Sequence, residues 1–94
     1  MYFISLVYKD MKHVSCIGFV DTFKKADLFI KSHSYDFPNC RYAIVENVKE
    51  GIFMYDENPI FYSLTSNKQA QKLKNVPKEF KNKIGLGFGM KIEN

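Results

Sequence analysis

The side chains with the widest chemical range in this sequence are two histidines and two cysteines, because both types bind metal ions and act in nucleophilic catalysis. They are His13, Cys16, His33 and Cys40. A structural zinc ion needs four such ligands converging at about 2.0 to 2.3 Å. His13 and Cys16 lie three residues apart in an expected strand, where side chains at that spacing point to opposite faces. The spacing therefore disfavours a metal site.

Nucleophilic catalysis requires a thiol activated by a neighbouring base. The sequence pairs neither cysteine with a histidine, and Asp56 and Glu57 precede Asn58-Pro59 in an expected turn, the usual place of solvated carboxylates. We therefore expect a protein that is not an enzyme, with no catalytic residues, no metal and no cofactor. The apolar start at residues 1–8 has neither a basic stretch before it nor a cleavage site after it, so we do not expect it to be a signal peptide. Two reduced thiols in a cytoplasm are the simplest prediction, and a disulfide is the alternative.

The positive charge of the chain is concentrated near its C-terminus. Residues 1–65 carry seven basic and eight acidic side chains, whereas residues 66–94 carry seven lysines and two glutamates. Lysines in such a segment contact either phosphates or an acidic protein surface, and a solvated face without a partner is the alternative. The predicted partner-binding residues are Lys68, Lys72, Lys74, Lys78, Lys81, Lys83 and Phe88.

Apolar residues alternate with glycine three times within residues 84–92. The run lacks the spacing of a dinucleotide-binding or Walker loop. In a strand, such alternation places the large side chains on one face and leaves bare backbone on the other. The segment is therefore expected to be a strand of the domain or an arm that reaches another subunit.

The elements that would position these residues follow from the apolar periodicity. Residues 2–8 and 13–20 alternate as two strands of a hairpin, and Asp21 and Thr22 offer caps to a helix that ends near Ser34. Two further strands are predicted over residues 41–48 and 60–64, with a weak helix over residues 65–74.

This order predicts an α+β fold, in which a small antiparallel sheet of about ββαββ order has one helix packed on one face. Ninety-four residues make a single domain. It divides into a core over residues 1–65 and a basic, glycine-containing C-terminal segment over residues 66–94.

Several segments resemble a family of small ββαβ proteins from bacteriophages and prophages of Gram-positive bacteria. The likeness is carried by Tyr2 to Tyr8, Ile17-Gly18-Phe19-Val20 with Ala26 and Ile30, residues 42–52, Phe61-Tyr62, and the closing Pro77, Phe80, Ile84, Phe88 and Gly89. The sequence lacks the tryptophan near the fourth strand and the longer acidic insert that often occur in the family. No activity is attached to the family, so the resemblance implies a fold and a phage-type origin.

The preferred functional prediction is a non-enzymatic, phage-type binding protein that modulates or inhibits a protein of the bacterial host, such as a defence system, in the host cytoplasm. High aromatic content supports it, because interfaces are enriched in Tyr and Phe. A nucleic-acid-binding module that uses the same lysines is one alternative. An oligomer that sequesters a nucleotide is another, and no membrane partner is expected.

Overall fold

A computed structural model describes residues 1–48, 59–65 and 67–83, and the placement of side chains up to residue 80. The elements are β1 (Tyr2–Tyr8), β2 (Val14–Val20), α1 (Phe23–Ser32), β3 (Cys40–Asn47), β4 (Ile60–Thr65), β5 (Lys68–Lys72) and the 3₁₀ helix η1 (Lys78–Lys83). The α+β class predicted from the sequence is confirmed.

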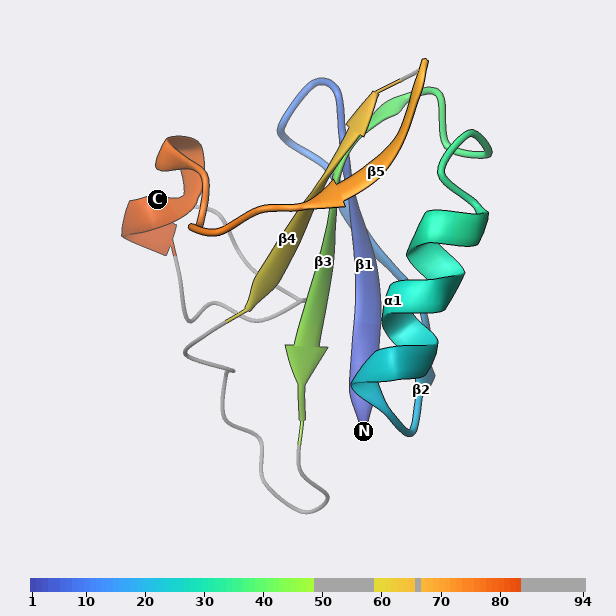
Figure 1. Ribbon diagram of the computed structural model, residues 1–94. Helices are drawn as coiled ribbons and strands as arrows, with labels where there is room; N and C mark the ends of the chain where they lie inside the picture. The colour runs from blue at the N-terminus through green and yellow to red at the C-terminus, as the bar shows by residue number, and fades with distance from the viewer. Residues whose placement is uncertain (49–58, 66, 84–94) are drawn as a thin grey trace.

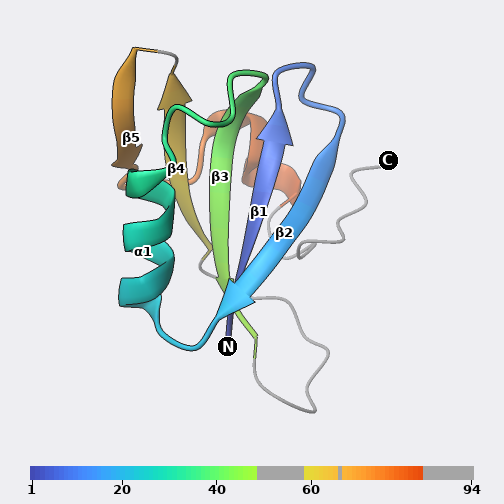
Figure 2. The same ribbon diagram turned by 90° about the vertical axis from the view of Figure 1, so that its right-hand side faces the viewer.

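The five strands form one antiparallel sheet in the order β2-β1-β3-β4-β5. The connection from β2 through α1 to β3 passes over β1, which therefore lies between β2 and β3. Figure 1 shows α1 on one face of the sheet, and Figure 2 shows the strands side by side with β2 and β5 at opposite edges. The predicted hairpin is confirmed, with an irregularity where Ile4-Ser5 pairs with Gly18 and Cys16.

Helix α1 begins where the sequence predicts capping. Thr22 is the N-cap, and its hydroxyl accepts a hydrogen bond of 3.1 Å from the backbone N–H of Lys25. Ala26 and Ile30 are buried against the sheet, whereas Leu28 faces solvent. The helix ends at Ser32, two residues before the predicted end.

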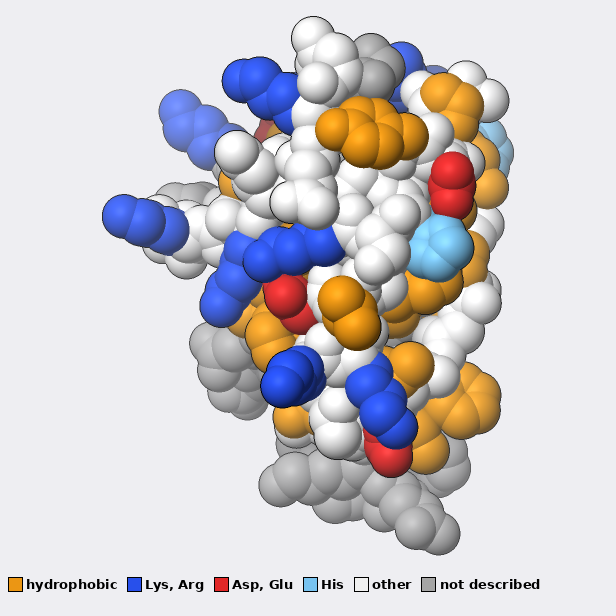
Figure 3. Space-filling view, turned by 45° about the vertical axis from the view of Figure 1, so that its right-hand side comes forward, with side chains coloured by type: hydrophobic (Ala, Val, Ile, Leu, Met, Phe, Trp, Pro, Cys, Tyr) orange, Lys and Arg blue, Asp and Glu red, His pale blue; other side chains and the backbone are white. Residues whose placement is uncertain are grey.

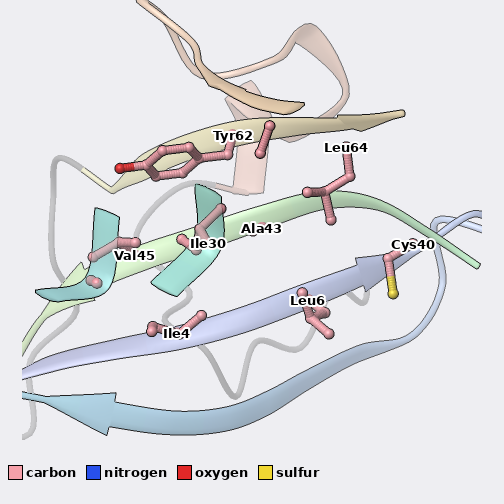
Figure 4. Close-up of a cluster of buried hydrophobic side chains, with 10 residues drawn as sticks. Ile4, Leu6, Ile30, Cys40, Ala43, Val45, Tyr62 and Leu64 are labelled. Atoms are coloured by element: carbon pink, nitrogen blue, oxygen red, sulfur yellow. The ribbon is translucent and has the colours of Figure 1, made fainter. Parts of the chain in front are cut away.

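The core between α1 and the sheet consists of apolar side chains from α1 and from strands β1, β3, β4 and β5 (Figure 4). Each large aliphatic side chain buried there contributes about 1.5 to 3 kcal/mol relative to exposure. Its buried members are Ile4, Leu6, Ala26, Ile30, Cys40, Ala43, Val45, Tyr62, Leu64 and Ala70.

A second apolar cluster covers the opposite face of the sheet over β3 and β4. Helix η1 brings Phe80 onto this face, where its ring centroid lies 5.1 Å from that of Phe61 and 5.8 Å from that of Tyr42. Phe80 is buried within this short helix. Part of the C-terminal segment thus packs on the sheet.

The predicted helix over residues 65–74 is wrong, because residues 68–72 form strand β5. Lys72, Gln71 and Lys68 pair with Tyr62, Ser63 and Thr65 of β4. A helix here would have only Ala70 and Leu73 as its apolar stripe, whereas the strand buries Ala70 in the core and satisfies the edge of β4. The element order is therefore ββαβββ, and the sheet continues beyond residue 65.

Several predicted features lie outside the described residues. They are the carboxylates of Asp56 and Glu57, and the glycine-alternating segment at residues 84–92 with Phe88. Within the described ranges, no helix has the length and apolarity needed to cross a bilayer.

Candidate binding surface

The structure divides the predicted partner-binding lysines into two groups. Lys68 and Lys72 lie at the two ends of the edge strand β5, Lys74 is exposed in the segment that follows, and Lys78 is exposed at the start of η1. Lys81 and Lys83 belong to η1, with side chains outside the described set, and Phe88 lies outside the described residues. Lys68, Lys72 and Lys74 thus lie along one edge of the sheet and its continuation, whereas Lys78 belongs to the helix that packs on the opposite face.

Helix α1 runs beside β5 and adds its own charged residues to this edge. The side-chain amide of Gln69 donates to the backbone carbonyl of Lys31 at 3.4 Å, and the N–H of Ala70 donates to Ser34 Oγ at 2.7 Å. Lys24, Asp27 and Lys31 follow one another at spacings of three and four, so they share a stripe of the helix. Figure 3 shows lysine side chains gathered over this part of the molecule.

We call this set the α1/β5 surface, defined by Lys24, Lys25, Asp27, Leu28, Lys31, Lys68, Lys72 and Lys74. The concentration of charge near the C-terminus predicts only the lysines of β5 and the segment after it, and not those of α1. The lysines of α1 and of β5 form one surface because residues 68–72 pair with β4 as a strand, and the sequence pattern did not indicate this pairing.

Asp27 is the one carboxylate of this surface that reaches into the protein. Its Oδ1 accepts a hydrogen bond of 2.6 Å from the hydroxyl of Tyr62, and its Oδ2 lies 3.3 Å from Lys31 Nζ. The Tyr62 hydrogen bond is the main reason that the pKa of Asp27 is lowered, with Lys31 adding to it. Burial is the main reason that the pKa of Tyr62 is raised, with Asp27 adding to it.

Lys72 is held by two features of α1. Its Nζ lies 5.4 Å from the centroid of the Phe23 ring, a cation–π arrangement that contributes about 0.5 to 1 kcal/mol at an exposed site. Its charge also helps to lower the pKa of Asp27. Lys72 is therefore partly a structural residue, whereas Lys24, Lys68 and Lys74 have no ion-pairing carboxylate among the described residues.

Leu28 is an apolar residue in the middle of these charges. It is 64% exposed, and helical spacing makes Lys24, Lys25 and Lys31 its neighbours on the helix surface. Tyr35, in the turn after α1, is 59% exposed. The solvent side of α1 thus presents a large apolar side chain next to lysines, and Figure 3 shows hydrophobic side chains exposed among lysines on this part of the surface.

The histidines and cysteines are distributed over separate parts of the fold. His13 pairs with Asp10 in the connection after β1, and His33 pairs with Asp36 at 2.7 Å after α1. Both cysteines are free thiols: Cys16 is exposed on β2, and Cys40 is buried on β3, where desolvation raises its pKa. In the portion of the chain that the structure describes, no three His, Cys, Asp or Glu residues form a group that could hold a metal ion.

Comparison of the chain with models of known protein families, with curated proteins and with solved structures gave no match.

Proposed function

We propose that this chain is a non-enzymatic binding protein of phage type, which modulates or inhibits a protein of its bacterial host by docking on an acidic patch of that protein through the α1/β5 surface. Defence proteins of the host are the first class of partner to test. The resemblance noted in the sequence motivates the phage-type origin. The α1/β5 surface motivates the mode of binding.

The observation that carries the proposal is the exposure of Leu28 among three lysines. Interfaces place an apolar side chain at the centre and polar residues at the rim. Burying Leu28 in a partner's pocket contributes up to about 1.5 to 3 kcal/mol. The flanking lysines add little affinity at the rim, but they accelerate encounter with an acidic surface and set its orientation.

A protein partner fits this surface better than a nucleic acid. On this surface a phosphate backbone would be bound mainly by the lysines. Two lysines beside Leu28 are already paired with carboxylates: Lys25 with Asp21 at 3.0 Å and Lys31 with Asp27 at 3.3 Å. Those carboxylates repel a phosphate backbone. An exposed leucine also offers a base no ring on which to stack.

The test begins with capture from a lysate of a Gram-positive host by the tagged protein, with and without nuclease. A captured protein is then purified, and its Kd for the chain is measured by calorimetry. We expect Leu28→Ala to weaken binding by about tenfold, and the triple change Lys24→Glu, Lys68→Glu, Lys74→Glu to slow association steeply at low salt.

The matched control is the pair Lys9→Glu and Lys12→Glu. Both lysines are exposed in the connection between β1 and β2, at the opposite edge of the sheet from β5 (Figure 2). If the control weakens binding as much as the triple change, the docking surface is placed wrongly. If capture disappears with nuclease, and if the chain binds random duplex with an affinity that falls steeply as salt rises, the chain is a nucleic-acid-binding module instead.

A further inference from the structure

The two edges of the sheet are built differently. Edge strand β5 carries Lys68 and Lys72, has a register shift opposite β4, and is covered in the middle by Ser34 of the α1 end, which accepts the hydrogen bond from the Ala70 N–H. Charges, irregular pairing and cover are the usual means by which proteins prevent strand addition. The β5 edge is therefore closed to a further strand.

Edge strand β2 has only one of these protections. Val14–Val20 contains no charged residue and no proline, and its single irregularity is the register shift next to Ile17. Ile17 is 41% exposed, Phe19 is 60% exposed, and Cys16 is exposed as well. Among the described strands, only β1 pairs with it. A neutral, apolar strand with one unpaired edge is a template for another strand.

We propose that a second copy of this chain pairs antiparallel with β2, so that the two sheets continue into each other across a two-fold axis. Charge determines which edge of the sheet two copies can share. The chain has a formal net charge of +4, so two copies repel each other at most contacts, and pairing β5 with itself would bring Lys68 and Lys72 together. Pairing β2 with itself brings no like charges into opposition.

The geometry also limits the assembly. An isologous contact uses the same strand of both copies, so it closes at a dimer. Because β5 is closed, the described strands of the paired sheet leave no open edge at β5 that would extend it into a fibre. The interface consists of one short strand from each copy with Phe19 and Ile17 beside it, which is at the small end of specific interfaces and gives a dimer in the micromolar range. This inference is independent of the proposed function, which uses the other side of the molecule.

Light scattering with size-exclusion chromatography tests the proposal on the full chain, with a reducing agent so that a disulfide through Cys16 does not contribute. At about 500 μM we expect a mass approaching twice the 11.0 kDa of one chain, and at about 5 μM we expect a mass close to that of one chain. Ile17→Lys should shift the dissociation constant by at least about tenfold, because like charges then meet at the edge. Leu28→Lys adds the same charge on α1 and should leave the dimer intact.

Hydrogen exchange of the unmodified chain decides the matter if Ile17→Lys does not fold. Backbone amides of residues 14–20 should gain protection as concentration rises. A strict monomer at the highest concentration overturns the proposal. This holds if the β2 amides exchange freely, and it holds equally if another part of the same chain protects them at every concentration. Loss of the dimer in Leu28→Lys but not in Ile17→Lys overturns it as well, because the contact would then lie on α1.

Discussion

The hydroxyl of Tyr62, which is fully buried on β4, donates a 2.6 Å hydrogen bond to the carboxylate of Asp27 on α1. The two residues are 35 positions apart in the sequence. The bond satisfies the only polar atom of the Tyr62 side chain, and it fixes how the helix lies along the sheet. It also places a charge at the base of the α1/β5 surface, where Lys31 and Lys72 compensate it.

Removing this hydroxyl should destabilise the fold. We expect Tyr62→Phe to lower the free energy of unfolding by about 1.5 to 3 kcal/mol, the range for hydrogen bonds to charged groups. Urea denaturation followed by circular dichroism measures it. Tyr35→Phe is the matched control, since Tyr35 is exposed. If the two variants were equally stable, the hydrogen bond of Tyr62 to Asp27 would be no more favourable than the hydration of that hydroxyl in the unfolded chain.

The same bond makes stability depend on acid. The pKa of Asp27 is lowered from its ordinary 3.8 in the folded state, so the unfolded chain binds the proton more readily. The stabilisation is therefore present above pH 3.8 and is lost as the pH falls through the lowered value. Between pH 5 and pH 2, the unfolding free energy of Asp27→Asn should fall less than that of the unmodified chain. Parallel pH profiles for the two proteins would contradict this prediction.

Ser34 links the end of α1 to the edge strand. Its buried hydroxyl accepts from the Ala70 N–H at 2.7 Å and donates toward the carbonyls of Ile30 and Lys31. We expect Ser34→Ala to cost about 1 to 3 kcal/mol, because it leaves a buried N–H without a partner. Ser32→Ala, at the exposed end of the helix, should change stability by less than about 0.5 kcal/mol. Thermal melts of the two variants give the comparison.

The two thiols should react at very different rates. Cys16 is exposed, whereas Cys40 is 5% exposed and burial raises its pKa. Only the thiolate reacts with a disulfide reagent. We expect one thiol to react rapidly with Ellman's reagent in the folded protein and the second only at the rate of unfolding. Cys16→Ser should remove the fast phase; its persistence in that variant would contradict the assignment of Cys40 as buried.

Local patterns predicted most of the described elements. Alternation identified β1, β2, β3 and β4 to within a residue or two at each end, and the Thr22 cap located the start of α1. These elements were found because each carries its own apolar periodicity. Strand β5 carries almost none: Lys68 to Lys72 has a single apolar residue and poor strand propensity. It is a strand because β4 offers an unpaired edge, which is a property of the fold and not of the segment.

In the candidate surface, too, some residues could be predicted from the local sequence and others could not. The lysines of β5 were predicted from charge alone, whereas the sequence pattern indicated no role for Leu28 or Asp27. The role of Asp27 depends on Tyr62, and the role of Leu28 depends on its neighbours lying next to β5. Contacts across such sequence separations leave no local spacing that could predict them.

The position of β1 between β2 and β3 has a consequence during synthesis. The ribosome delivers β1 and β2 first, and they can pair at once through their short connection. The other edge of β1 and its apolar residues Ile4 and Leu6 remain uncovered until α1 and β3 have also left the exit tunnel. The interval between the emergence of Tyr8 and that of Asn47 is therefore the time when the nascent chain is most prone to aggregation and most in need of a chaperone.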